Sequence, residues 1–237
     1  MFQFKQFNIE DSSSPMKVGT DAVLLGAWMP TKNNNPKVLD IGTGCGVISL
    51  MMAQRMPHAE IHAIDIDNGA WIDAKNNFQN SIWNNRLNII TPAPIQDFTK
   101  ENNEKFDIIV SNPPFFIDSF KCNKTSRNLA RHNDSLSFTD LIACINSLLT
   151  DDGFFAGILP FNEGSKFIDL AYSENLFCFK KTLVADRPDK EYKRILFCLS
   201  KHKAKDIDTS SLYIRNNDRS YSNEYLELTK DFYTFIP

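Results

Sequence analysis

Long apolar runs are missing from this sequence of 237 residues. No stretch approaches the roughly 18 apolar residues that a membrane span needs, and residues 1–14 contain no apolar core of signal-peptide length. We therefore expect a cytoplasmic protein without a membrane contact. The length suits one α/β domain with a small appendage.

Paired cysteines and a strong net charge are missing as well. The five cysteines are odd in number and contain no CxxC pair, and the four histidines do not have metal-ligand spacing. This pattern excludes a disulfide framework and predicts free thiols and no metal site. Because the net charge is only −3, binding to nucleic acid would have to depend on local basic patches.

Strand-like and helix-like segments alternate after about residue 36. Short apolar runs rich in β-branched residues predict strands at 37–41, 60–65, 86–90, 106–110 and 153–159. Helix-length segments occupy 47–56, 68–80, 137–149 and 163–174. This alternation predicts a parallel sheet with helices on both faces. Two more apolar runs, 176–184 and 194–200, are separated by a loop too short for a helical crossover, and they predict an antiparallel hairpin at the sheet edge.

A glycine-rich turn joins the first expected strand to its helix. It has a D-x-G-x-G-x-G pattern, formed by Asp40, Gly42, Gly44 and Gly46. The NAD fingerprint fails because Val47 stands where it requires glycine. Asp65 ends the second strand, where doubly wound folds bind ribose hydroxyls. The glycine-rich turn and Asp65 together favour S-adenosylmethionine as the ligand. Asp65 would bind its ribose, and Asp40 would reach the amino group of its methionine end. The alternative is an ordinary tight turn beside a solvated acid.

The stretch SNPPFF (111–116) follows the strand at 106–110, next to the same crevice. The Asn112 amide oxygen and the Pro113 carbonyl are acceptors that suit a planar NH₂ group. Pro114 restrains the backbone, and Phe115 offers a flat face for a planar substrate. Methyl transfer to such an amine needs positioning and charge stabilisation, without a nucleophile or a metal. A proline-rich loop above a phenylalanine core is the alternative.

These motifs together resemble the class I S-adenosylmethionine-dependent methyltransferases that methylate amino groups. NPPF alone is shared with other families, including rRNA guanine-N2 enzymes. Three further segments resemble the bacterial tRNA1(Val) (adenine(37)-N6)-methyltransferase family: MKVGTDAVLLGAW (16–28), RPDKEYKRILF (187–197) and LTKDFYTFI (228–236). The resemblance implies transfer of a methyl group to N6 of the adenine beside the anticodon of a valine tRNA.

The resemblance also implies a fold and further site residues. We expect a Rossmann-like domain at 36–237 with a seven-stranded, mostly parallel sheet, and an N-terminal segment, 1–35, on its cofactor side. Thr20 and Asp21 would lie near the cofactor's amino-acid end, although a helix cap is an equal alternative. Ile66 would join Asp65. The family tends to carry an acid just before Ile-Gln, but here Pro94 precedes Ile95, and either Asp97 substitutes or the Ile95 backbone and apolar contacts hold the adenine.

Two basic runs could bind phosphates. Residues 121–131 carry four cations and no acid: Lys121, Lys124, Arg127 and Arg131. Residues 180–205 carry nine cations against three acids, and the candidates within the expected hairpin are Arg187, Lys190, Lys193 and Arg194. Basic runs beside a site favour RNA over a small substrate, and an anticodon loop over a duplex, because a base must leave its stack. The alternative is an ordinary solvated surface.

Other functions remain open at this point. The same NPP turn would suit a guanine-N2 methyltransferase of rRNA or a methyltransferase of protein glutamine side chains. A non-catalytic module that binds S-adenosylmethionine and RNA is a third alternative. We expect a monomer.

Overall fold

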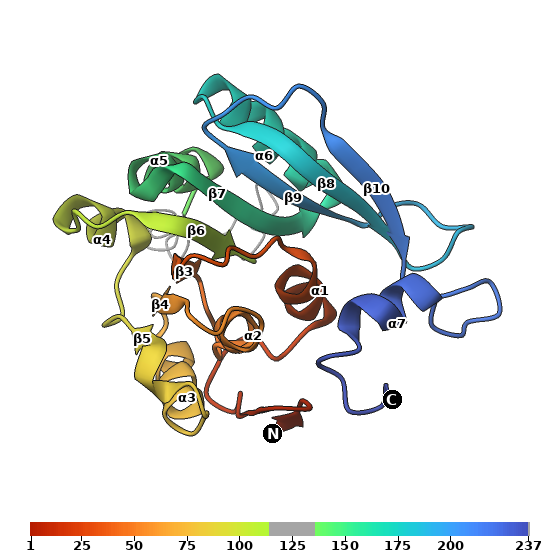
Figure 1. Cartoon of the computed structure of the whole chain (residues 1–237), viewed down its shortest axis with the longest axis horizontal. Helices are drawn as coiled ribbons and strands as arrows, with labels where there is room; N and C mark the ends of the chain where they lie inside the picture. The colour runs from red at the N-terminus through yellow and green to blue at the C-terminus, as the bar shows by residue number, and fades with distance from the viewer. Residues whose placement is uncertain (114–135, 237) are drawn as a thin grey trace, which may run out of the picture.

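The computed structural model describes residues 1–113 and 136–236, and these residues form a central sheet of eight strands. The strands follow the spatial order β10-β8-β9-β7-β6-β3-β4-β5 (Figure 1). Their bounds are β3 (Lys37–Ile41), β4 (Glu60–Ile64), β5 (Leu87–Ile89), β6 (Phe106–Ser111), β7 (Leu149–Pro160), β8 (Phe177–Ala185), β9 (Arg194–Ser200) and β10 (Asp208–Tyr213). β9 runs antiparallel to β7 and β8, and the other neighbours are parallel.

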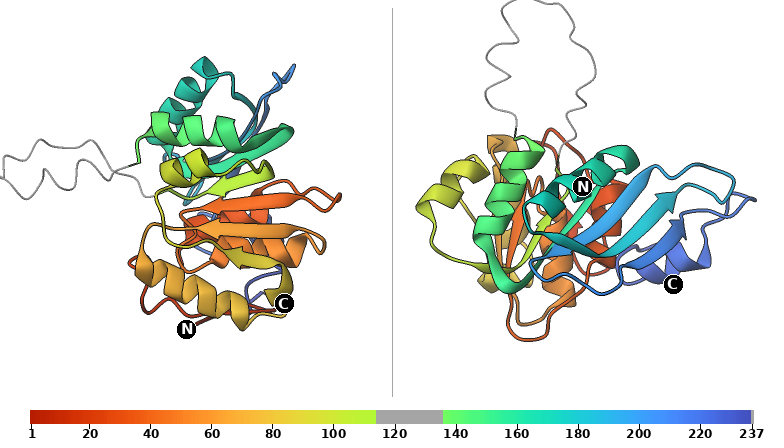
Figure 2. Two further views of the ribbon diagram at one scale, coloured as in Figure 1. Left: turned by 90° about the vertical axis from the view of Figure 1, so that its left-hand side faces the viewer. Right: turned by 90° about the horizontal axis from the view of Figure 1, so that it is seen from above.

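Helices cover both faces of the sheet, which confirms the predicted fold class. Figures 1 and 2 show α1 and α2 on one face and α5 and α6 on the other. The helices are α1 (Thr20–Trp28), α2 (Val47–Arg55), α3 (Asn68–Gln79), α4 (Ile95–Glu101), α5 (Phe138–Leu148), α6 (Phe161–Ser173) and α7 (Asn223–Thr229), with a 3₁₀ turn at Asn84–Arg86. Successive strand residues point to opposite faces of the sheet, so they enter two different hydrophobic cores. Val38 belongs to the core under α1 and α2, and Leu39 belongs to the core under α5 and α6.

The predicted count of seven strands is wrong, because β10 pairs in parallel with β8 and makes an eighth. The β8–β9 hairpin exists as predicted, but β10 covers its outer side. β10 reads DTSSLY, and only Leu212 within it is buried. Such a strand is held by backbone pairing and has no apolar run for a sequence pattern to detect.

Aromatic side chains join the two ends of the described chain. Phe4 forms a backbone bridge with Tyr233, and their rings stack with centroids 6.0 Å apart. A short two-stranded sheet, β1 (Phe2–Gln3) and β2 (Asn8–Ile9), flanks this contact. The division of the chain at residue 36 stays a prediction.

Candidate active site

The glycine-rich turn and the NPP turn leave neighbouring strand ends. Ile41 of β3 pairs with Ser111 of β6, and the Ser111 Oγ donates a hydrogen bond of 2.8 Å to the Ile41 carbonyl. Gly42 and Asn112 follow these paired residues directly. The strand order also reverses here, since β4 lies on one side of β3 and β6 on the other. Open α/β sheets bind ligands in the crevice at such a reversal.

All three glycines of the turn have backbone angles that other residues rarely adopt. The φ values are +69° at Gly42, +57° at Gly44 and +85° at Gly46. Around Gly42 and Gly44, no described atom lies within 4 Å of the position that a Cβ would take. At Gly46 a Cβ would lie 2.5 Å from the Phe78 ring of α3. The first two glycines therefore border open space, and the third allows close packing.

Asp40 is fully buried beneath this turn. Its Oδ2 accepts hydrogen bonds from Thr43 Oγ1 at 2.8 Å and Ser49 Oγ at 2.7 Å. Its Oδ1 has no hydrogen-bond partner among the described residues. Burial raises the pKa of Asp40 to about 6, and the nearby Asp65 charge adds to this effect, while the two hydroxyls oppose it. A buried acid with one unused oxygen fits a ligand that carries an ammonium group.

Asp65 follows β4 and is half-exposed. Its Oδ2 accepts a hydrogen bond of 2.8 Å from the Gly44 N–H, and its Oδ1 accepts one of 2.9 Å from the Asp67 N–H. A carboxylate oxygen has lone pairs for further donors, so these bonds leave room for ligand hydroxyls. Ile66 beside it is 56% exposed. Asp65 therefore links the glycine-rich turn to the end of β4.

Asn77 of α3 supports the turn from the opposite side. Its Nδ2 donates hydrogen bonds of 2.8 Å to the carbonyls of Cys45 and Glu10, and its Oδ1 accepts one of 2.9 Å from the Glu10 N–H. Asp73, one helical turn earlier, accepts three hydrogen bonds from Ser13 and Ser14. Sequence reasoning missed both residues. The pattern of α3 gave no signal for these roles, because their partners lie far away in the chain.

Cys45 lies between two glycines of the turn, yet its thiol is not a reactive group. The side chain is buried. Burial raises the pKa of its thiol to about 12, so the nucleophilic thiolate is not populated at neutral pH. This agrees with the expectation of a free thiol, which also holds for the other described cysteines, Cys144, Cys178 and Cys198.

The remaining cofactor candidates lie on two helices, α1 and α4. Thr20 begins α1 and is exposed, and α1 has no side-chain cap, so the cap alternative is wrong. Asp21 forms an ion pair with Arg194 of β9, with 2.7 Å between Nε and Oδ2. Ile95 is buried at the start of α4, and the exposed Asp97 pairs with Lys100 at 3.0 Å.

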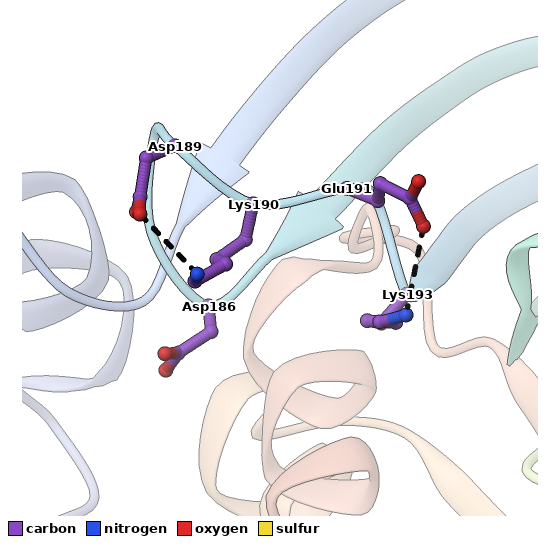
Figure 3. A pocket seen from close by; sticks show the side chains of 5 residues that line it. All are labelled: Asp186, Asp189, Lys190, Glu191 and Lys193. Atoms are coloured by element: carbon purple, nitrogen blue, oxygen red, sulfur yellow. Dashed lines mark ion pairs between the residues drawn. The ribbon is translucent and has the colours of Figure 1, made fainter.

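The loop between β8 and β9 lies on the same side of the molecule as Asn112, where the parallel strands have their carboxyl ends. Because β9 is antiparallel, its first residue, Arg194, pairs with Pro160 at the carboxyl end of β7. The acids of the loop pair with its cations: Arg187 with Asp186 and Asp189, Lys190 with Asp189, and Lys193 with Glu191. A hollow of about 370 Å³ is lined by five of these residues: Asp186, Asp189, Lys190, Glu191 and Lys193 (Figure 3). The hollow belongs to this loop and does not include the glycine-rich turn.

The basic run at 180–205 is not one patch. Lys201 and Lys203 follow the far end of β9, and Lys201 pairs with Asp151 of β7 at 3.3 Å. Arg194 is the first residue of this seven-residue strand and therefore lies at its other end. The fold therefore spreads the run over both ends of the strands, with Lys180 and Lys181 inside β8. The four candidates of the hairpin lie at the strand ends that lead to Asn112.

Known proteins identify the family of this fold and site. A family model described as "Methyltransferase small domain" matches residues 13–136. A tRNA1(Val) (adenine(37)-N6)-methyltransferase from Flavobacterium johnsoniae is 41% identical over 233 residues, covering 98% of this chain and 99% of the relative. The chain belongs to this methyltransferase family. A relative of the same name from Parabacteroides distasonis is 42% identical over 232 residues, covering 98% of this chain and 97% of that one.

A solved structure supports the methyltransferase fold independently. The crystal structure of a predicted O-methyltransferase, protein Atu636 from Agrobacterium tumefaciens, matches with a TM-score of 0.70. It is 16% identical and covers 90% of this chain and 96% of that chain. At this identity the likeness concerns the fold alone.

Some candidates of the methyltransferase site lie outside the described residues. These are Pro114, Phe115, Lys121, Lys124, Arg127 and Arg131. Asn112 is half-buried and Pro113 is buried. In the part of the chain that the structure describes, no group of three His, Cys, Asp or Glu residues could hold a metal ion. No helix of residues 1–113 or 136–236 is long and apolar enough to cross a membrane.

Proposed function

We propose that this protein transfers the methyl group of S-adenosylmethionine to the exocyclic N6 amine of the adenine beside the anticodon of a valine tRNA. One observation carries the proposal: the pairing of Ile41 with Ser111 sets the glycine-rich turn next to the NPP turn. Membership in the tRNA1(Val) (adenine(37)-N6)-methyltransferase family names the substrate.

The proposed cofactor site is built on two carboxylates, the buried Asp40 of β3 and the half-exposed Asp65 that follows β4. Asp65 accepts hydrogen bonds from the ribose hydroxyls, and the unused oxygen of Asp40 receives the amino group, directly or through water. The open space at Gly42 and Gly44 admits the methionine end, near Thr20 and Asp21, while Gly46 closes the turn onto α3. Ile66, Ile95 and Asp97 lie toward the adenine. Since the Asp97–Lys100 pair is exposed, the Asp97 carboxylate can exchange Lys100 for an adenine amine.

When bound, the cofactor would supply a methyl group on a positively charged sulfur, and breaking the sulfur–methyl bond would leave a neutral thioether. Asn112 Oδ1 and the Pro113 carbonyl accept the two hydrogens of the target amine. These bonds favour a pyramidal nitrogen whose lone pair points at the methyl group, and they stabilise the positive charge that develops there. Pro114 restrains the turn, and Phe115 stacks on the adenine. The surplus proton leaves to water, since an alkylated adenine amine is strongly acidic while it is charged.

The proposed RNA contacts are electrostatic and surround this centre. The four cations of 121–131 and the hairpin residues Arg187, Lys190, Lys193 and Arg194 bind phosphates of the anticodon region. The protein acts as a monomer in the cytoplasm, where its tRNA substrate is found.

Labelled S-adenosylmethionine incubated with unmodified total tRNA, followed by nucleoside analysis, tests the proposal. We expect label in N6-methyladenosine, and a tRNA lacking the adenine beside the anticodon should remain unlabelled. A parallel incubation with rRNA and with total protein covers the alternatives. Label in N2-methylguanosine or in glutamine side chains, or no labelled product, would contradict the proposal.

A further inference from the structure

A row of three aromatic rings lies at the carboxyl ends of the parallel strands, where Asn112 follows β6. Phe161 follows the carboxyl end of β7, Tyr192 lies two residues before β9, and Tyr213 ends β10. The ring centroids are 6.3 Å apart for Phe161 and Tyr192 and 6.4 Å for Tyr192 and Tyr213. The second pair is nearly parallel, at 20°. The row therefore begins directly after β7, the sheet neighbour of β6, and extends to the outermost strand, β10.

The three rings are half-buried, and hydrogen bonds connect the two tyrosines to each other and to β10. The Tyr192 hydroxyl lies 2.9 Å from Ser211 Oγ and 3.4 Å from the Tyr213 hydroxyl, within hydrogen-bond distance of both. The backbone around them is also held, since the Phe161 N–H donates to the Lys193 carbonyl at 3.1 Å. Rings that are held in advance lose little conformational entropy when a partner binds.

Cations accompany the rings at this edge. Lys190 and Lys193 flank Tyr192 in sequence, and their carboxylate partners lie in the same loop (Figure 3). Ion pairs of this kind, between exposed side chains, contribute little to stability. A phosphate group can therefore replace the carboxylate at either lysine without a large loss of folding energy. Rings and exchangeable cations in one row are the features that bind unpaired nucleotides.

We propose that Phe161, Tyr192 and Tyr213 form a stacking platform for unpaired nucleotides that flank the target adenine, with Lys190 and Lys193 on their phosphates. This inference rests on the proposed function and specifies how the substrate is held. The occupant is a single-stranded RNA loop, because the faces of bases within a duplex are covered by their neighbours.

Tyr172 provides a matched control at the opposite edge. It lies near the end of α6, is 56% exposed, and packs edge-on against Phe177 with centroids 5.4 Å apart. Lys203 lies 5.6 Å from its ring centroid. Tyr172 therefore has an aromatic neighbour and a lysine, as Tyr192 does, but it lies away from the candidate active site.

The test compares the KM and Kd for unmodified tRNA in the wild type, Tyr192→Ala, Tyr192→Phe and Tyr172→Ala. Tyr192→Ala should weaken tRNA binding roughly 5- to 150-fold, the effect of losing one base–aromatic stack. Tyr192→Phe should stay within about threefold of the wild type, because stacking needs the ring and not the hydroxyl. Tyr172→Ala and the Kd for S-adenosylmethionine in every variant should not change.

Phe161→Leu, which keeps apolar volume but removes a ring, replaces Tyr192→Ala if the latter does not fold. The platform is refuted if loss of the ring leaves tRNA binding intact, or if Tyr192→Phe or Tyr172→Ala weakens binding as much as Tyr192→Ala. If the wild type methylates tRNA but the ring variants bind tRNA as well as the wild type does, the platform is refuted and the proposed function stands. A wild type that methylates no tRNA contradicts the proposed function instead.

Discussion

The two halves of the sheet use polar residues in opposite ways. Around the glycine-rich turn, Asp40 of β3, Asp65 after β4 and Asn77 of α3 are buried or half-buried, and they are hydrogen-bonded to backbone groups and hydroxyls. Between β8 and β9, acids and cations are half-exposed or exposed and pair with one another. Buried hydrogen bonds are costly to break, whereas exposed ion pairs exchange partners at little cost. The first half suits a small cofactor of fixed shape, and the second suits a large, charged substrate.

The largest effect should come from the junction of the two halves. Asn112→Ala removes one proposed acceptor of the target amine, so turnover should fall by about 10²–10³ with the Kd for S-adenosylmethionine nearly unchanged. Single-turnover methylation and calorimetric titration of the cofactor measure the two quantities. Asn112→Asp keeps an acceptor oxygen and should recover part of the rate. Unchanged turnover in Asn112→Ala would remove this residue from the mechanism.

Asp65→Ala should act on the cofactor alone. It removes the ribose acceptor and releases the Gly44 N–H, and hydrogen bonds to a charged group contribute enough to weaken binding about 10- to 100-fold. The Kd for S-adenosylmethionine, measured by calorimetry, checks this, and the Kd for tRNA should stay at the wild-type value. If cofactor affinity does not move, the ribose assignment is wrong.

The buried carboxyl of Asp40 predicts a pH dependence. Its pKa is about 6 in the folded protein against 3.8 as the ordinary value, so the stability it contributes is full below about pH 4 and is lost as the pH rises through 6. A shift of this size corresponds to about 2–3 kcal/mol. Asp40→Asn should therefore have the larger free energy of unfolding at pH 7.5, with the two proteins approaching one another near pH 4. Urea titrations at both pH values measure this.

Folding favours the protonated form of Asp40, but binding of the cofactor should favour its ionised form. An ammonium group favours ionised Asp40, so the wild-type affinity for S-adenosylmethionine should fall as the pH drops through 6. Asp40→Asn should bind the cofactor more weakly at pH 7.5 and should lack this dependence. An identical pH profile in the two proteins would show that Asp40 does not face the amino group.

Asn77→Ala tests whether the glycine-rich turn needs support from α3. It leaves the Cys45 carbonyl and both backbone groups of Glu10 without their partner, so cofactor affinity should fall about tenfold and the Tm should drop. Asn76→Ala is the matched control, because Asn76 is exposed on the same helix. A lower Tm without a change in cofactor affinity would mean that Asn77 supports the fold and not the turn.

The sequence predicted the first half of the site better than the second. The glycine-rich turn depends on the backbone freedom of Gly42, Gly44 and Gly46, which a local pattern reveals. The glycine-rich turn lies near Asn112 because neighbouring parallel strands have their carboxyl ends on the same side of the sheet. Asn77 and Asp73 escaped prediction because their partners lie about 30 to 70 residues away, and a helical pattern does not encode such contacts.

The second half depends on strand pairing that no local pattern shows. β10 is polar, and its place beside β8 arises from backbone hydrogen bonds. The basic run at 180–205 looks continuous in the sequence, but the antiparallel course of β9 separates Lys193 from Lys203 by the length of a strand. A count of charges along a chain therefore overstates the patch that a substrate meets.

The smallest expected effect on folding comes from Lys193, in the loop between β8 and β9. Lys193 and Glu191 are exposed and their charged atoms lie 3.8 Å apart, so Lys193→Ala should change the free energy of unfolding by less than about 0.5 kcal/mol. If Lys193 meets a phosphate, the slope of log Kd for tRNA against log salt should fall by about 0.7. Lys203→Ala, at the other sheet edge, should leave that slope unchanged. Equal slopes in the two variants would mean that the hairpin edge has no special role in binding RNA.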